Sequence, residues 1–145
     1  MTAFLTPPWI AILVAGISAF LAIKTYLANT NTKRAEFLLE LHKSFFVEET
    51  YDHIRELLDN SSHASRDSLH HEVAAETEEL TGFLNFFELI AYFEVCNTLR
   101  HKDVRALLGY YLDLLKAEPV LSHYIGKDDK SFENLKKLLN LKLSN

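Results

Sequence analysis

The stretch that decides the fold is Leu84–Phe93, with the sequence LNFFELIAYF. The apolar run that contains it extends from Gly82 to Phe93, which is well short of the roughly twenty residues that a membrane-spanning helix needs. Acidic residues flank this run, and Glu88 interrupts it. Apolar side chains cover nearly the whole circumference of such a helix, which is typical of a helix buried in a protein core. We therefore predict that this segment is the central helix of a helical domain.

The polar residues of this segment share one helix face, because they are spaced by four, three and four positions: Thr81, Asn85, Glu88 and Tyr92. This face is either a narrow solvated strip or a polar seam inside the bundle or at a subunit interface. In the second case a buried Glu88 needs a partner. Arg55 and Arg105 are candidates because each lies among apolar positions of its own helix. The predicted polar core group is Asn85, Glu88 and Arg55.

The composition and patterning of the whole chain indicate a helical protein. Its 145 residues include only 4 Gly and 3 Pro, and no segment shows the alternating pattern of a β-strand. We predict an all-α fold with one N-terminal transmembrane helix in residues 1–28 and a cytosolic domain in residues 29–145, a bundle of four to five helices. The expected elements are a polar hinge at 28–33, an exposed loop at 60–71, and helices at about 34–60, 72–99, 102–117 and 132–143. The segment 34–60 is either one helix or two helices that meet at Val47–Glu49.

Residues 9–27 have the properties of a membrane span. They carry one charge, Lys24, and place Trp9 and Tyr26 near the two edges, where amphipathic rings prefer to lie. Nineteen helical residues extend roughly 28 Å, close to the hydrocarbon thickness of a bilayer. A cleaved signal peptide is the alternative, but a basic segment before the apolar run and a clear cleavage site are both missing. A soluble core helix is disfavoured because no charge interrupts the first 23 residues.

The flanking charges predict the orientation of this span. Lys24, Lys33 and Arg34 follow it, and no basic residue precedes Trp9. The positive-inside rule therefore places the C-terminal domain in the cytoplasm and the N-terminus outside the inner membrane. A row of small residues predicts that the span packs against a second copy: Ala11, Ala15, Ala19 and Ala22. The alternative is that these alanines reflect the ordinary composition of a span.

Charge limits the partners that the domain can have. The net charge is −5, and 14 of the 15 basic residues and all 20 acidic residues lie after residue 28. Such a domain repels phosphate backbones, so we predict no long nucleic acid as a partner. The densest basic cluster is Arg100, His101, Lys102 and Arg105, at an expected helix start where backbone N–H groups favour anions. It is either a solvated turn or the site of a small anionic ligand.

Motifs of catalysis and metal binding are lacking in the sequence. The four glycines are isolated, so no phosphate-binding loop is predicted. Cys96, the single cysteine, reads as a buried structural thiol on the central helix. His63, His70 and His71 lie in or beside one loop without the spacing of metal ligands. We therefore predict a protein that is not an enzyme and has no cofactor or metal.

Two blocks of residues resemble a family of small bacterial proteins of unknown function. They are an LNFFE-x-IA motif and a following helix start: Leu84, Asn85, Phe86, Phe87, Glu88, Ile90 and Ala91, then Asp103, Val104, Leu107 and Leu108. The resemblance covers about a third of the chain and implies one N-terminal membrane helix with a helical cytosolic domain. The family usually has a glycine-containing turn where this chain has residues 96–99. This layout is similar to that of membrane effectors of bacterial antiviral systems, some of which sense a cyclic nucleotide.

Three functions are compatible with these features. The first is a self-associating membrane effector whose cytosolic domain senses a ligand or partner and perturbs the membrane helices. The second is a passive tether that recruits a protein partner. The third is a small hydrolase with unrecognised motifs that uses Glu88 and a histidine.

Overall fold

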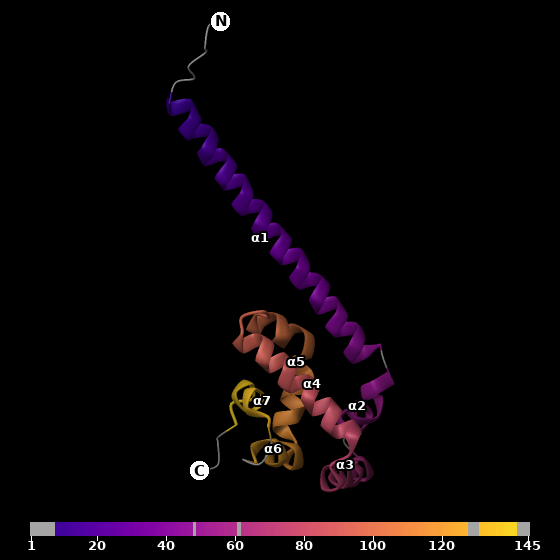
Figure 1. Ribbon diagram of the computed structural model, residues 1–145. Helices are drawn as coiled ribbons and strands as arrows, with labels where there is room; N and C mark the ends of the chain where they lie inside the picture. The colour runs from indigo at the N-terminus through magenta and orange to yellow at the C-terminus, as the bar shows by residue number, and fades with distance from the viewer. Residues whose placement is uncertain (1–7, 48, 61, 128–130, 142–145) are drawn as a thin grey trace, which may run out of the picture. The chain divides into compact units, whose positions relative to one another are not determined.

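The computed structural model describes residues 8–47, 49–60, 62–127 and 131–141, and most side chains of residues 8–28 lie outside this description. The described residues form α-helices and one short 3₁₀-helix, with no strand among them (Figure 1). The prediction of an all-α fold is therefore confirmed. The elements are α1 (Pro8–Phe46), η1 (Glu49–Tyr51), α2 (Asp52–Asp59), α3 (His63–Ala75), α4 (Glu78–Val95), α5 (His101–Ala117), α6 (Pro119–Gly126) and α7 (Glu133–Leu138).

The chain divides into two compact units, Met1–Phe37 and Leu38–Asn145. The predicted hinge at 28–33 is wrong, because α1 is continuous from Pro8 to Phe46. Asn and Thr differ from good helix formers by less than about 1 kcal/mol per residue, and the segment contains no Gly or Pro to stop a helix. Within the described part of the chain, no helix combines the length and the apolar content that crossing a bilayer requires.

Helix α4 forms the centre of the second unit, as its apolar circumference predicts. Its residues contact η1, α2, α5 and α7. The buried side chains of α4 share one broad face of the helix: Leu80, Phe83, Leu84, Phe86, Phe87, Ile90 and Ala91. No simple amphipathic stripe marks this helix in the sequence, because its exposed face also carries the large apolar residues Leu89, Tyr92 and Val95.

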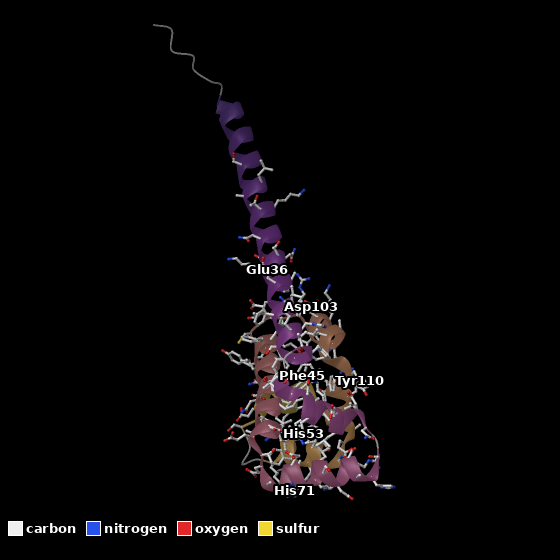
Figure 2. The ribbon with its side chains drawn as sticks, turned by 90° about the vertical axis from the view of Figure 1, so that its right-hand side faces the viewer. Glu36, Phe45, His53, His71, Asp103 and Tyr110 are labelled. Carbon is white, nitrogen blue, oxygen red and sulfur yellow. The ribbon has the colours of Figure 1, made fainter. Side chains whose placement is uncertain are left out.

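Phe45, from the last turn of α1, lies inside the second unit and has no exposed surface (Figure 2). Its ring stacks on Phe86 with 5.1 Å between centroids. It meets Phe87 and Tyr111 edge-on, at 5.5 and 5.1 Å. Edge-on and offset arrangements are the favourable geometries for aromatic pairs. Phe45 therefore joins α4 and α5 into one aromatic core.

The segment at 60–71, expected to be an exposed loop, is mostly helix. Helix α3 starts at His63, after Ser62 accepts a hydrogen bond from the backbone N–H of Ser65 at 3.2 Å. Leu69 is 2% exposed, so one apolar residue anchors this polar helix. The abundance of Ser and His favoured a loop in the sequence because these residues are poor helix formers, but a serine cap and tertiary burial outweigh that preference.

The single helix expected at 72–99 is two helices, α3 and α4. Glu76 adopts a left-handed conformation with φ of 49° and ends α3. Thr77 then caps α4 by accepting a hydrogen bond from the backbone N–H of Leu80. This tight turn brings the end of α3 next to the start of α4.

The C-terminal half follows the prediction more closely. Helix α5 has nearly the predicted bounds, and Pro119 begins α6. Helix α7 is shorter than expected. The described residues after position 47 form six α-helices rather than four to five, because α3 occupies most of the expected loop and α6 lies between two predicted helices. Within this unit α7 lies beside α4, and α3 lies beside α6 (Figure 1).

The turn after α4 adopts a left-handed conformation without glycine. Asn97 has φ of 57°, and Asn is the residue that tolerates this conformation best after Gly. The backbone N–H groups of Thr98 and Leu99 both donate to the carbonyl of Phe93, at 2.9 and 3.1 Å. Cys96, predicted to be buried, is exposed at this turn.

Candidate functional site

The predicted basic cluster lies at the start of α5. Arg100 is the residue that precedes the helix, and its side chain makes no capping hydrogen bond. All four side chains of the cluster are exposed: Arg100, His101, Lys102 and Arg105. Two of them, His101 and Arg105, line a pocket of about 250 Å³ together with Lys116 from the end of α5. Arg100 and Lys102 do not line it.

Acidic neighbours already engage both pocket-lining members of this cluster. Arg105 donates to both carboxylate oxygens of Asp113, at 3.0 and 3.3 Å. His101 Nδ1 lies 2.9 Å from Glu94 Oε1. An anion in this pocket therefore has to compete with Asp113 for the Arg105 guanidinium.

Glu88 is half-buried and pairs with α7 rather than with an arginine. Its Oε1 accepts hydrogen bonds from the backbone N–H and side-chain amide of Asn134, at 3.1 and 2.6 Å. Its Oε2 accepts from the backbone N–H of Leu135, at 2.7 Å. A carboxylate is favourable at a helix N-terminus because the first N–H groups have no partner in the helix itself. Glu88 therefore caps α7 from another helix, in place of Phe132, which cannot.

Asn85, Glu88 and Arg55 do not form the polar core group that the sequence predicted. Asn85 is exposed. Arg55 pairs with Asp52 within its own helix, and its guanidinium lies over the rings of Phe45 and Phe46 at 5.6 and 5.8 Å. The cation–π contact and the local carboxylate hold the guanidinium where it lies, whereas the buried Nε of Arg55 has no hydrogen-bond partner among the described residues. Both Glu88 oxygens are occupied by α7, which does not favour Glu88 as the acid or base of a hydrolase.

The predicted membrane-packing row falls mostly outside the described side chains. This holds for Ala11, Ala15 and Ala19, whereas Ala22 is exposed in the single chain.

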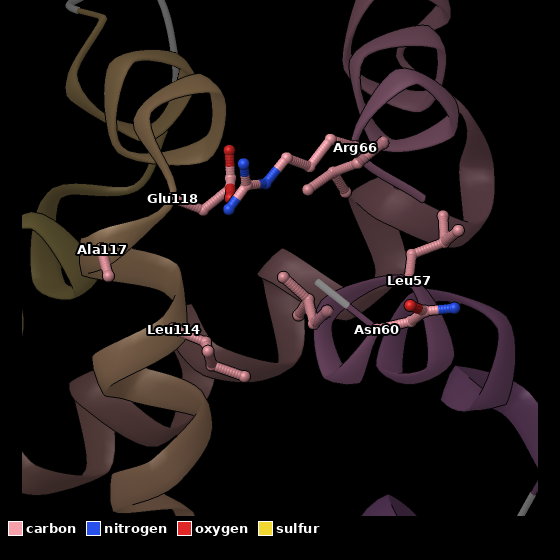
Figure 3. A pocket seen from close by; sticks show the side chains of 8 residues that line it. Leu57, Asn60, Arg66, Leu114, Ala117 and Glu118 are labelled. Atoms are coloured by element: carbon pink, nitrogen blue, oxygen red, sulfur yellow. The ribbon is translucent and has the colours of Figure 1, made fainter. Parts of the chain in front are cut away.

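A second pocket, of about 200 Å³, lies between α2, α3 and α5. Leucines and an alanine form much of its wall. Figure 3 shows Arg66 and Glu118 extending toward one another across it. The pocket combines apolar walls with one charge of each sign, so it does not select strongly for either a cation or an anion.

A cluster that no sequence pattern predicted lies where α2, α3 and α4 meet. His53, Glu72 and Glu79 each present one ligand atom there, and these atoms lie within 4.8 Å of one another. His53 Nε2 is 3.3 Å from Glu72 Oε1. The three residues line a pocket of about 470 Å³ with Thr77 and Glu78. This is the one group of metal-ligand type found among the described residues.

The turn between α3 and α4 positions Glu72 in this cluster. The Thr77 hydroxyl donates to Glu72 Oε2, and the Thr77 backbone N–H donates to the Glu72 carbonyl at 3.3 Å. The Thr77 hydrogen bond is the main reason that the pKa of Glu72 lies below its ordinary value of 4.5, and His53 adds to the effect while burial opposes it. Glu72 is therefore held as a carboxylate near neutral pH.

The histidines singled out in the sequence are not part of this cluster. His63, His70 and His71 all belong to α3, where each is exposed. The cluster instead uses His53, nineteen residues before Glu72, so no local spacing motif exists to reveal it. The one available signal was the repetition of glutamates around residues 72–79, which alone is equally typical of a solvated helix start.

No protein-family model, no curated protein and no solved structure matches this chain. The function therefore has to be argued from its own residues.

Proposed function

We propose that this chain is a non-enzymatic, membrane-anchored protein that self-associates and senses a ligand or partner through its helical domain. In this proposal residues 9–27 cross the inner membrane with the N-terminus outside, and the C-terminal domain lies in the cytoplasm. Ligand or partner binding biases the membrane helices and perturbs the bilayer. The observation that carries the proposal is the apolar sequence of residues 9–27, which contains Lys24 as its one charge.

The support for the anchor comes from sequence and chain geometry. Residues 9–27 all belong to α1, so their backbone N–H and C=O groups are paired along one helix. A bilayer requires such internal pairing because it offers no water to polar groups. Lys33 and Arg34 follow on the proposed cytoplasmic side, in agreement with the positive-inside rule.

The support for self-association is the alanine row, Ala11, Ala15, Ala19 and Ala22. Lipid tails are as apolar as leucine, so membrane helices associate through close packing rather than through the hydrophobic effect. Small residues four positions apart allow that close approach.

The support for ligand sensing is the pocket at α5. Arg105 and Lys116 supply positive charge there and His101 supplies a ring nitrogen, with Asp113 as the acidic lining residue. A small anion such as a cyclic nucleotide suits this chemistry, because guanidinium and ammonium groups bind phosphate oxygens directly. The role in bacterial antiviral defence comes from similarity of layout and is proposed at that level only.

Oligomeric state tests the proposal most directly. We expect the full-length protein in mild detergent to form oligomers in light scattering, and Ala15→Ile to shift them toward monomer. Leu13→Ile is the matched control and leaves the oligomer intact. Recovery of the protein in the soluble fraction of lysed cells, and not in the membrane fraction, would contradict the anchor. A monomer at every protein concentration would contradict self-association.

Ligand sensing has its own test. Arg105→Gln is expected to abolish binding of a cyclic nucleotide in calorimetry, whereas Lys102→Gln, outside the pocket, retains it. Failure of all cyclic nucleotides and of other small phosphates to bind the wild-type chain would remove this part of the proposal and leave the anchor in place.

A passive tether is the second candidate, and one feature of α4 favours it. Leu89, Tyr92 and Val95 are large apolar residues that are 46%, 49% and 58% exposed, and they recur every three positions along the helix. Such a row is typical of a surface that contacts another protein. Replacing residues 9–27 with an unrelated apolar helix distinguishes the two: a tether keeps its function, whereas the self-associating effector loses it.

A further inference from the structure

We propose that His53, Glu72 and Glu79 form a binding site for a divalent transition-metal ion, with Zn²⁺ as the best-suited member of that class. The site lies at the junction of α2, α3 and α4. This inference does not depend on the membrane anchor or on ligand sensing at α5.

The geometry of the cluster suits a small cation. Metal–ligand bonds of about 2.1 Å place neighbouring ligand atoms about 3.0 Å apart in octahedral and about 3.4 Å apart in tetrahedral coordination. The distance between His53 Nε2 and Glu72 Oε1 is 3.3 Å, within this range. Glu79 is exposed, so its side chain can close the remaining gap by changing rotamer at little cost in packing.

Glu72 is already oriented for this role. Its Oε2 accepts the hydroxyl hydrogen of Thr77, which leaves Oε1 turned toward His53. Metal-ligating carboxylates are commonly fixed in this way by a hydrogen bond from a neighbouring group. The side chain of Glu72 is 15% exposed, whereas that of His53 is 51% exposed. Glu72 is therefore the least exposed of the three ligands, and His53 and Glu79 are accessible from solvent.

The surroundings favour a cation over an anion. The pocket is lined by one histidine, one threonine and three glutamates: His53, Thr77, Glu72, Glu78 and Glu79. Concentrated negative charge raises the local concentration of cations. The volume of about 470 Å³ leaves room for water ligands, which is typical of an exchangeable site rather than a closed structural one.

The ligand types narrow the choice of metal. Mg²⁺ and Ca²⁺ prefer oxygen ligands throughout, whereas an imidazole favours Zn²⁺ and its neighbours in the first transition row. A bound ion would also hold three helices together, because each ligand comes from a different helix. We therefore expect metal binding to raise the stability of the folded domain.

The experiment uses the full-length chain in detergent, first treated with a chelator and then dialysed. Zn²⁺ is titrated by calorimetry, and melting temperature is measured with and without Zn²⁺. The variants are His53→Gln and Glu79→Gln, whose exposed side chains can change without disturbing the core. The matched controls are Glu78→Gln, in the same pocket but outside the cluster, and His63→Gln, on α3.

We expect one Zn²⁺ per chain and a higher melting temperature on binding. Either cluster variant should weaken binding by at least about tenfold, and both controls should bind as wild type does. Equal melting temperatures of all variants in chelator would establish that each is folded. Absence of Zn²⁺ binding by the wild-type chain, or cluster variants that bind as tightly as the controls, would overturn the proposal.

Co²⁺ supplies a second readout. An ion held by His53 and two carboxylates gives visible absorption bands that change in His53→Gln. A Co²⁺ spectrum identical in wild type and His53→Gln would place the ion on other residues and contradict the site.

Discussion

Glutamates on α4 belong to two different carboxylate sites, and the contrast between them separates a structural role from a binding one. Glu88 accepts three hydrogen bonds from Asn134 and Leu135, so both of its oxygens are used by α7. Glu79 is exposed and converges with His53 and Glu72 beside a pocket that all three line. A carboxylate whose acceptors are saturated by the fold stabilises the fold, whereas one that converges with other ligand atoms beside a pocket is available to a cation.

The largest effect is expected in the aromatic core around Phe45. Phe45→Ala should lower the free energy of unfolding by about 3–5 kcal/mol, because it opens a cavity where the ring contacts α4 and α5. Chemical denaturation of the full-length protein in detergent measures this, with the exposed Val47→Ala as the control. A loss below about 1 kcal/mol would show that Phe45 does not join these helices.

The second-largest effect on stability is expected where Glu88 caps α7. Glu88→Ala should cost about 2 kcal/mol, because it leaves the backbone N–H groups that begin α7 without their acceptor. Hydrogen exchange at Asn134 and Leu135 should accelerate more than exchange elsewhere in the domain. Glu88→Gln keeps one acceptor oxygen and should fall between Glu88→Ala and wild type. Unchanged hydrogen exchange at these two amides in Glu88→Ala would show that Glu88 does not cap α7.

A smaller effect on stability, which depends on pH, is expected from a substitution in the turn between α3 and α4. Thr77→Val should cost about 1 kcal/mol at neutral pH, because it removes the cap of α4 and the hydroxyl bonded to Glu72. The pKa of Glu72 is lowered in the fold, so its contribution to stability is present above pH 4.5 and is lost as the pH falls through the lowered value.

The destabilisation by Thr77→Val should therefore shrink in acid, down to the part that comes from the cap alone. Stability curves of both proteins from neutral pH to below pH 4.5 measure this, with Thr77→Ser as the control that retains the hydroxyl. A difference that stays constant with pH would show that Thr77 does not set the Glu72 pKa.

The smallest effect is expected at Glu79 when no metal is present. Glu79→Ala should change the free energy of unfolding by less than about 1 kcal/mol in chelator, because an exposed carboxylate in a first helical turn contributes through the helix dipole alone. A loss as large as that of Glu88→Ala would erase the contrast between the two sites. It would make Glu79 a structural residue.

Local pattern was enough to predict some elements and misleading for others. The regular apolar spacing of residues 102–117 predicted α5, whereas α6, which begins at Pro119, was not predicted. The prediction of a loop after Ser62 was wrong, because burial of a single leucine, Leu69, stabilises α3 as a helix. The break between α3 and α4 was missed because Glu76 carries no sequence signal for its left-handed backbone.

The sequence by itself determined that the chain is helical, that Leu84–Phe93 lies in a core helix, and that Glu88 is exceptional within it. These features depend on composition and on spacing along one helix, which are local properties. Only the tertiary structure decided that Glu88 caps α7 and that His53, Glu72 and Glu79 converge. Both results join residues from different helices, and the turns and packing that bring them together leave no spacing rule in the sequence.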